Sequence, residues 1–425
     1  MWQKLSLVWK IPEVRNKILF VLGILFIFRV AAHIPVPGVN LQALSNFFRT
    51  NQFLGLLNVF SGGGYDTFSV IMLGVGPYIT SSIIFQLLTM IVPSLERLQK
   101  EGERGQEKIN QWTRYLTVPL AALQGYGTIT LIRRSSSAIL PNLTPYQFAT
   151  AMVTITAGTI FLMWLGELIS EKKIGNGISL MIFAGIVARV PTQLQQTAAV
   201  IDSSRIIQIL TFAMLGLITI IGVVFVTEAV RKIPVTYARR VRGSQMIGGS
   251  DTFLPLRVNQ AGVIPIIFAI SIVLMPSLIA QFFATSKVIW LQHAASLTLR
   301  VFQQGGVLYD SLYFILVFAF TYFYTAVVFQ PHQISENLQK QGGFIPGIRP
   351  GKQTADYLGY VTNRIMLAGA LFLGVIAILP NIVQRFTGVT TLIVGGTSLL
   401  IVVSVVIETV KQIESQLIVR DYEGF

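Results

Sequence analysis

Cysteine is absent from this chain of 425 residues, and histidine occurs only three times. Without cysteine, neither a disulfide framework nor a thiolate metal site can form, and the redox compartment is left undetermined. The three histidines, His33, His293 and His332, are too few and too widely spaced for a metal cluster. We therefore expect no metal ion and no other cofactor.

Charge is also scarce. Charged residues make up 12% of the chain, whereas soluble domains contain about 25%. Hydrophobic residues make up 53%, and the mean hydropathy is +0.66. This composition predicts an all-α membrane protein that crosses the bilayer many times. Its formal net charge of +14 must then lie mainly in the loops.

The motifs of enzymes and nucleotide-binding proteins are missing as well. The sequence has no G-x-x-x-x-G-K-[ST] phosphate loop and no His-Glu-x-x-His, and its apolar runs hold no Asp pair or Ser–His couple. We therefore do not expect an enzyme. Any energy from nucleotides must come from a partner protein.

Acidic residues avoid the middle of the apolar runs. Glu167, Glu228 and Glu408 all lie near the predicted cytoplasmic ends of such runs. A charge at mid-membrane costs about 2.5–3.5 kcal/mol and is usually retained for function. A small-molecule transporter driven by protons or sodium would normally carry one there. Such a secondary transporter remains the alternative, because uncharged polar residues can also bind sodium.

Ten apolar runs are candidate membrane spans, although the fifth is short. If the N-terminus is cytoplasmic, 23 Lys and Arg residues fall in cytoplasmic segments and 8 in outer segments. This split follows the positive-inside rule and predicts that both termini are cytoplasmic. The runs are Ile18–Ile34, Val70–Val92, Leu116–Ile132, Ala149–Ile169, Ile178–Val190, Ile206–Val226, Ala261–Phe283, Leu312–Phe329, Ile365–Pro380 and Thr391–Ile407.

Ten spans divide into two halves of five. The first half covers residues 1–190 and the second covers residues 206–425, including a tail at 411–425, and an outer connection at 191–205 joins them. An odd number of spans in each half makes the two halves inverted relative to each other. Many transport proteins are built in this way, with the pathway between the halves.

The stretch Phe53–Pro93 contains a break between two apolar pieces. The three glycines Gly62–Gly64 each cost a helix roughly 1 kcal/mol relative to alanine. The piece before them, Phe53–Phe60, is too short to span, whereas Val70–Val92 is long enough. Non-helical backbone at membrane depth is tolerated only inside protein or beside a wet cavity. We therefore predict a re-entrant segment in a channel or transporter; a surface loop before an ordinary helix is the alternative.

Aliphatic side chains recur at helical spacing after this break. Val75 and Ile79 are four residues apart and share a helix face, as do Ile182 and Ile186 on the fifth run. A narrow aliphatic ring can close a pore by excluding water. Ordinary helix packing gives the same spacing, so periodicity alone does not select a pore face.

Two long cytoplasmic loops are expected, at residues 228–259 and 331–363. In the first, alternation around Ile233–Val241 and a Gly-Gly turn predict a projecting β-ribbon. Its basic residues suit RNA phosphates or an acidic protein surface, although positive-inside topology also explains their sign. In the second loop, Arg349 stands between Ile348 and Pro350 in a Gly/Pro-rich stretch that is expected to reach well out from the membrane.

Eight motifs occur in order between Phe28 and Ile401. They are Phe28-Arg29 with Ile34–Val39, Asn58–Gly63, Gly76–Ile79, Lys100–Glu103, Gly175–Ser179, Asn259–Pro265, Phe344–Gly351 and Gly395–Ile401. Together they resemble the SecY family, the central subunit of the bacterial Sec protein-translocation channel. The resemblance covers nearly the whole chain, and the residues Arg420–Phe425 are similar to the family's cytoplasmic tail.

The resemblance implies a protein-conducting channel with ten helices, which passes unfolded secretory polypeptides and releases apolar segments sideways into lipid. It implies a plug at residues 53–69 and a lateral gate between the second and third spans of each half. We assign Thr80 and Gln124 to that gate, although routine hydrogen bonding between helices is as good an explanation. The implied pore ring is Val75, Ile79, Ile182, Ile186, Ile267 and Ile401, and the assigned plug residues are Phe60, Ser61, Gly62, Gly63 and Gly64.

The implied partners follow from the same resemblance. They are the membrane subunits SecE and SecG, the SecA motor or the ribosome on the cytoplasmic face, signal sequences, unfolded precursors and anionic lipids, all at the inner membrane of a bacterium. The residues assigned to motor or ribosome docking are Arg239, Arg240, Arg242, Arg349 and Lys352.

The chain departs from the family pattern directly after the glycines. It has Gly64-Tyr65-Asp66-Thr67, where relatives often carry a small or apolar residue followed by a basic one. Arg189, after the fifth run, has no role in the pattern. Contacts around Tyr65-Asp66 are therefore not specified by the resemblance.

Overall fold

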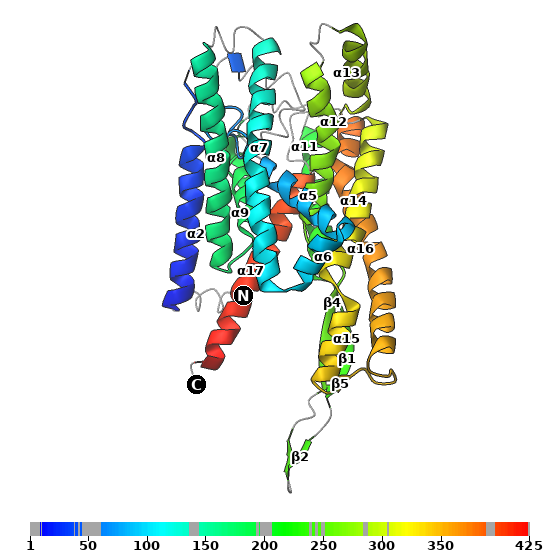
Figure 1. Cartoon of the computed structure of the whole chain (residues 1–425). Coiled ribbons are helices and arrows are strands. Elements are labelled where there is room, and N and C mark those ends of the chain that lie inside the picture. The colour runs from blue at the N-terminus through cyan, green and yellow to red at the C-terminus, as the bar shows by residue number, and fades with distance from the viewer. Residues whose placement is uncertain are drawn as a thin grey trace.

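The computed structural model describes residues 9, 11–37, 39–40, 43–44, 61–135, 144–192, 195, 206–237, 240–242, 245–247, 251–283, 288–303, 306–387 and 396–423. They form a bundle of roughly aligned helices, from one end of which a small β-sheet projects (Figure 1). We call this end the sheet end and the other the far end.

Each of the ten apolar runs lies largely within a helix. The first half holds α2 (Pro12–Ala31), α5 (Gly76–Ile91), α6 (Pro93–Lys100), α7 (Glu103–Ser135), α8 (Pro145–Glu171) and α9 (Gly177–Val187). The second half holds α11 (Ile206–Glu228), α12 (Ile264–Phe283), α13 (Ile289–Val301), α14 (Val307–Val328), α15 (Pro331–Lys340), α16 (Lys352–Thr387) and α17 (Gly396–Glu423).

Not every helix is long and apolar enough to cross a bilayer by itself. Within the described residues, three segments meet both criteria: Pro145–Glu171, Val307–Lys340 and Lys352–Val383. The pair α5 and α6, which bend by 100° at Val92, would make a fourth. Large apolar side chains such as Phe26, Leu210 and Phe225 are exposed on the bundle surface, as lipid contact requires. The count of ten spans stays a prediction.

The predicted span Val70–Val92 begins too early. Residues 61–75 form consecutive turns, and the helix starts only at Gly76, with Pro77 in its first turn. Gly74 adopts a φ of 59°, which ends any helix before it. The helix ends at Val92 because the following Pro93 favours an extended residue before it, and Val92 has φ −99° and ψ 110°.

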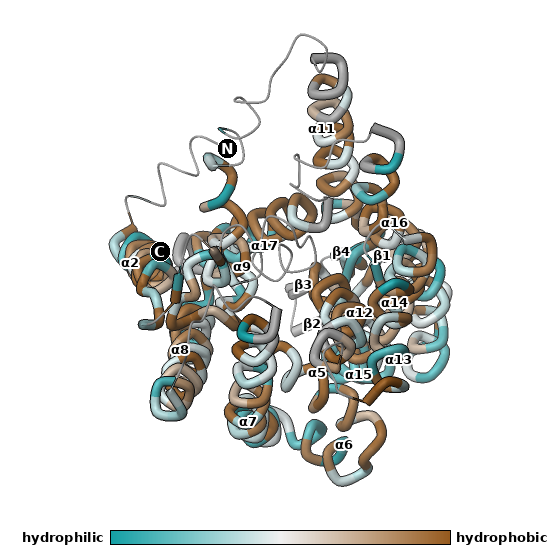
Figure 2. The backbone as a smooth tube through the Cα atoms, turned by 90° about the horizontal axis from the view of Figure 1, so that it is seen from above, coloured by the Kyte–Doolittle hydropathy of each residue, from teal (hydrophilic) through white to brown (hydrophobic). Residues whose placement is uncertain are grey.

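The two halves meet along a small set of helices. Seen along the bundle axis, α5, α9, α12 and α17 are grouped toward the centre, while α11 lies at the periphery (Figure 2). Across the halves, α12 contacts α5 and α7, and α17 contacts α9 and α2. One apolar cluster of buried side chains runs through both halves at this junction.

The body is helical, but the chain is not all-α as the composition suggested. Strands β1 (Val230–Tyr237) and β4 (Asp251–Arg257) pair antiparallel, which confirms the predicted ribbon. Beyond them β2 (Arg240–Arg242) pairs with β3 (Gln245–Ile247). The short β5 (Gly343–Phe344), from the second long loop, adds to the free edge of β1, so the sheet order is β4-β1-β5.

The two long loops therefore form one projecting unit. Its core contains Ile233, Val235 and Leu256 from the sheet, together with Leu338 of α15 and Leu358 of α16. The predicted loop at 331–363 is wrong in its extent, because α15 and the first turns of α16 occupy much of it. A Gly/Pro-rich composition indicated the connection Gly342–Gly351 but not the helices on either side.

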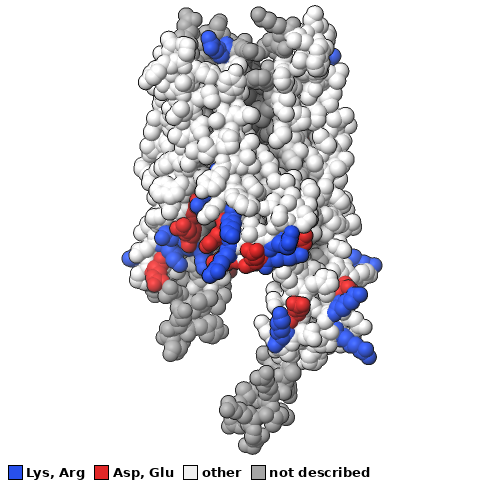
Figure 3. Space-filling view, viewed as in Figure 1, with Lys and Arg blue, Asp and Glu red and all other residues white. Residues whose placement is uncertain are grey.

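Charged side chains gather toward the sheet end on the face shown in Figure 3, while the middle of the bundle is nearly free of them. Two of the predicted acidic residues form ion pairs. Glu167 pairs with Arg114 at 2.6 Å, and Glu228 pairs with Lys411 at 2.8 Å. Each pair joins two helices, so these carboxylates connect helices within a half.

Candidate functional site

Residues 61–69, which we call the glycine-rich segment, are mostly buried and have no helical structure. Gly62 and Gly63 adopt φ values of 67° and 93°, which side chains rarely allow. A Cβ on Gly62 would lie 2.6 Å from Cζ of Phe28 and 3.2 Å from Cα of Gly185, so a side chain there would displace the Phe28 ring. Ser61 and Ser69 are buried, as a re-entrant segment requires. Phe60 and residues 53–59 of the predicted plug lie outside the described residues.

Polar contacts with Arg29, Arg189 and Ala32 attach the glycine-rich segment to its neighbours in the first half. Arg29 Nη1 donates to the carbonyl oxygen of Gly62 at 2.6 Å, and Arg189 Nη2 donates to Asp66 Oδ2 at 2.6 Å. Thr67 Oγ1 donates to the carbonyl oxygen of Ala32 at 2.7 Å. Arg29 lies within the first predicted span, and its guanidinium turns toward the glycine-rich segment. The sequence had left Arg189 and Asp66 without roles.

The apolar side of the same segment packs into the first half. Tyr65 and Phe68 are buried in a cluster with side chains of α7 and α8, among them Ile129 and Ile155. Backbone hydrogen bonds on either side, from Val36 N to Phe68 O at 2.9 Å and from Val70 N to Ile34 O at 3.0 Å, join it to the chain after α2.

The six residues of the implied pore ring come from helices of both halves. Val75 and Ile79 stand at the start of α5, Ile182 and Ile186 lie on α9, Ile267 lies on α12 and Ile401 lies on α17. All six belong to the apolar cluster that runs through both halves, and each is between 1% and 6% exposed. Close packing of aliphatic side chains from both halves would seal the interior against water.

The two residues assigned to the lateral gate make hydrogen bonds within their own helices. Thr80 Oγ1 donates to the carbonyl oxygen of Gly76 at 3.1 Å, and the carbonyl of Gln124 accepts from Thr128 Oγ1 at 2.8 Å. Both side chains are half-buried. These two hydrogen bonds therefore do not connect one helix to another, as the alternative explanation from sequence required. Contacts across the halves in this region are made by α12 with α5 and α7.

Four of the five predicted docking residues lie on the described part of the projecting unit. Arg240 and Arg242 lie in β2, and Arg239 lies outside the described residues. Arg349 and Lys352 are exposed around the turn into α16. Thr354 Oγ1 donates to the carbonyl oxygen of Arg349 at 2.9 Å, which holds this turn in one conformation. Its neighbours Gly347 and Gly351 have positive φ values of 83° and 96°.

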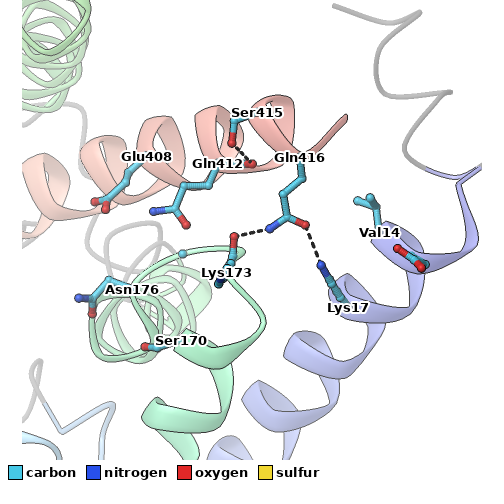
Figure 4. Close-up of a pocket in the computed structure, with 11 residues that line it drawn as sticks. Val14, Lys17, Ser170, Lys173, Asn176, Glu408, Gln412, Ser415 and Gln416 are labelled. Carbon is cyan, nitrogen blue, oxygen red and sulfur yellow. Dashed lines mark hydrogen bonds between the residues drawn. The ribbon is translucent and has the colours of Figure 1, made fainter. Parts of the chain in front are cut away.

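A cavity of about 800 Å³ opens at the sheet end between α2, the α8–α9 turn and α17. Figure 4 shows Gln416 at its centre, accepting from Lys17 Nζ at 3.1 Å and donating to the carbonyl oxygen of Lys173. Glu13 and Glu408 also line it, so its charges are mixed. The sequence did not predict this cavity, because its walls come from three distant segments. Within the described ranges, no group of three metal-ligating side chains occurs.

A buried ion pair in the second half was also missed. Asp310, in the first turn of α14, is 6% exposed and pairs with Arg385 of α16. Asn381 Nδ2 donates to its other oxygen at 2.6 Å. From sequence, Asp310 lay just before a span and Arg385 in an outer loop, so nothing indicated that they meet.

The sequence matches the SecY family model over residues 69–410. It is 45% identical over 435 residues to protein translocase subunit SecY of Thermotoga maritima, covering all of this chain and 98% of that protein. The SecY subunit of Streptomyces coelicolor is also 45% identical, with 98% of each chain covered.

Solved structures with the same fold support this match. The structure of a protein-conducting channel aligns with a TM-score of 0.63 at 17% identity, covering 94% of this chain and 91% of that one. Sec61 in the canine ribosome–channel complex from the endoplasmic reticulum aligns over the same shares with a TM-score of 0.60. A third structure aligns with a TM-score of 0.65; it was described as showing that the SecY plug domain stabilises the closed state of the channel and maintains a membrane seal. These likenesses establish the shared fold, and together with the full-length sequence identity they show that the chain belongs to the SecY family.

Proposed function

We propose that this chain is the channel-forming subunit of a protein translocase in a bacterial plasma membrane, with both termini cytoplasmic. The observation that carries the proposal is the buried aliphatic cluster at the junction of the halves, together with a mostly buried non-helical segment in the first half. In a membrane protein, non-helical backbone is tolerated at membrane depth only where it is buried in protein or lines a water-filled cavity. The match with translocase subunits points to polypeptide as the transported substance.

The proposed pore waist is the ring of Val75, Ile79, Ile182, Ile186, Ile267 and Ile401, and the glycine-rich segment is the described part of the plug. Aliphatic side chains offer no hydrogen bonds, so an unfolded chain can slide past them without being held. The same side chains exclude water and ions while the pore is closed. Apolar segments would leave sideways where α12 meets α5 and α7, near Thr80 and Gln124.

The projecting unit is the proposed docking site. Its exposed basic residues, Arg349 and Lys352, stand on a turn fixed by Thr354, at the end where charged residues concentrate. A fixed basic turn suits RNA phosphates or an acidic protein surface. By family resemblance the partners are SecA or the ribosome here, SecE and SecG in the membrane, and anionic lipids around them. The similarity to translocase subunits does not support the alternative of a small-molecule secondary transporter.

Crosslinking of a stalled precursor tests the pore. Single cysteines at Ile79, Ile182, Ile267 and Ile401 should each crosslink to a precursor halted midway, because the chain must pass the ring. The absence of native cysteine makes every adduct assignable.

Control cysteines belong at Phe26 and Leu217, which are 71% and 58% exposed on the bundle surface. They should give no adduct with a hydrophilic stretch of the precursor. Equal crosslinking at ring and control positions, or adducts at the controls alone, would refute a path through the ring.

A further inference from the structure

The glycine-rich segment is attached to the first half by two arginines. Arg29 closes the last turn of α2, and Arg189 lies in the turn after α9. One donates to a backbone carbonyl and the other to a carboxylate, both at 2.6 Å. Hydrogen bonds with a charged partner are stronger than neutral ones, and these two fix residues 62 and 66 on either side of Tyr65.

All of the contacts described above for this segment go to the first half. The arginines are on α2 and after α9, Thr67 donates to Ala32, and Tyr65 and Phe68 pack among side chains of α7 and α8. The junction between the halves is made elsewhere, by α12 against α5 and α7 and by α17 against α9 and α2. Parting α12 from α5 and α7 therefore breaks none of these contacts.

The segment also carries strain. Phe68 is 1% exposed and has a φ of 47°, a left-handed conformation that costs a non-glycine residue free energy. Tight burial and the flanking hydrogen bonds hold it in place. Once the polar contacts are broken, this strain lowers the free energy needed to move the glycine-rich segment away from α7 and α8.

We propose that Asp66–Arg189 and Arg29–Gly62 form a two-point latch that keeps the plug on the first half. Release of the latch is then a step separate from opening between the halves. This inference rests on the proposed channel function, in which the glycine-rich segment closes the pore. It assigns a positioning role to Asp66 and Arg189.

The test is single-channel conductance of the complete translocase in planar bilayers. Asp66→Asn and Arg189→Gln should each raise the open fraction about two- to five-fold, as expected for a partly exposed ion pair. The open fraction of the double variant should be little higher than that of either single variant, because both substitutions remove the same contact. Arg29→Gln should raise the open fraction by at least about tenfold, since a charged hydrogen bond to backbone is lost.

A matched control is available in the same half. Arg114 and Glu167 are also 2.6 Å apart, with side chains 46% and 22% exposed, against 22% and 41% for Arg189 and Asp66. Arg114→Gln should leave the conductance unchanged. Lateral insertion of an apolar segment, measured in proteoliposomes, should stay at the parental rate in the Asp66→Asn variant.

Deletion of residues 62–66 separates the two hypotheses. If the deletion causes no ion leak, the plug assignment in the proposed function is wrong. If the deletion leaks while Asp66→Asn and Arg189→Gln match the parent, or while the two changes act additively, the latch is refuted. If insertion rises in parallel with conductance, the separate release step is refuted.

Discussion

A single methyl group added at Gly158 of α8 should disturb the packing of α8 against the chain that directly follows the glycine-rich segment. An added Cβ would lie 1.9 Å from the carbonyl oxygen of Val70 and 2.7 Å from its carbonyl carbon, whereas ordinary contacts are 3.4–4 Å. The obstacle is backbone, so rotation of a side chain cannot relieve it. Either α8 or the chain at residue 70 must move in the Gly158→Ala variant.

Two opposing contributions set the change in the free energy of unfolding of the Gly158→Ala variant. Overpacking in a dense interior costs about 1–3 kcal/mol, and a backbone obstacle places this case toward the upper value. Alanine favours a helix interior over glycine by roughly 0.5–1 kcal/mol. We therefore expect a net loss of about 1–2 kcal/mol. Because Val70 directly follows the glycine-rich segment, ion conductance should also rise.

Thermal unfolding of the purified complex, followed by loss of its monodisperse chromatographic peak, measures the first effect, and planar bilayers measure the second. Gly216→Ala in α11 is the control, since a Cβ there meets nothing within 4 Å. That variant should be slightly stabilised and should not leak. If both variants shift the midpoint in the same direction, the close approach of α8 to Val70 is not what governs stability.

Two further predictions concern charged residues. Arg385→Leu leaves the carboxylate of Asp310 buried without its cation, so stability should fall by about 3–5 kcal/mol. An additional Asp310→Asn change should recover part of that loss in the same unfolding assay, and no recovery would contradict a buried-charge penalty. Arg349→Glu should block motor-driven export into membrane vesicles while leaving fold and membrane insertion intact. Export at the parental rate would rule out docking at this turn.

Local sequence signals predicted much of the fold. Apolar length located the helices, because each helix must satisfy its own backbone within lipid. Three consecutive glycines located the break, and the positive φ values of Gly62 and Gly63 confirm the reason. Alternation located the β1–β4 ribbon, since strand pairing in a hairpin is local. The predicted Gly-Gly turn was wrong: Arg242 pairs with Gln245, so the chain reverses between these two residues and not at Gly248-Gly249.

Features that depend on residues far away in the sequence could not be predicted from local patterns. The start of α5 was misplaced because residues 70–75 are as apolar as a helix, but their turns bond to the chain after α2. The addition of β5 to β1 joins loops about a hundred residues apart, and two residues of strand leave no periodicity to detect. The direction of Arg29 depended on an acceptor 33 residues away.

The candidate site shows the same division. Helical spacing paired Val75 with Ile79 and Ile182 with Ile186. Ile267 and Ile401 were added to them only through the family resemblance. In the structure all six belong to one buried apolar cluster. The partners of Asp66 and Arg189 followed from no pattern, because they are 123 residues apart. Composition and periodicity act along the chain, and so they set which segments are apolar, helical or broken. Which side chains meet was decided by packing, because contact between α2, α9 and the glycine-rich segment exists only after the helices have assembled.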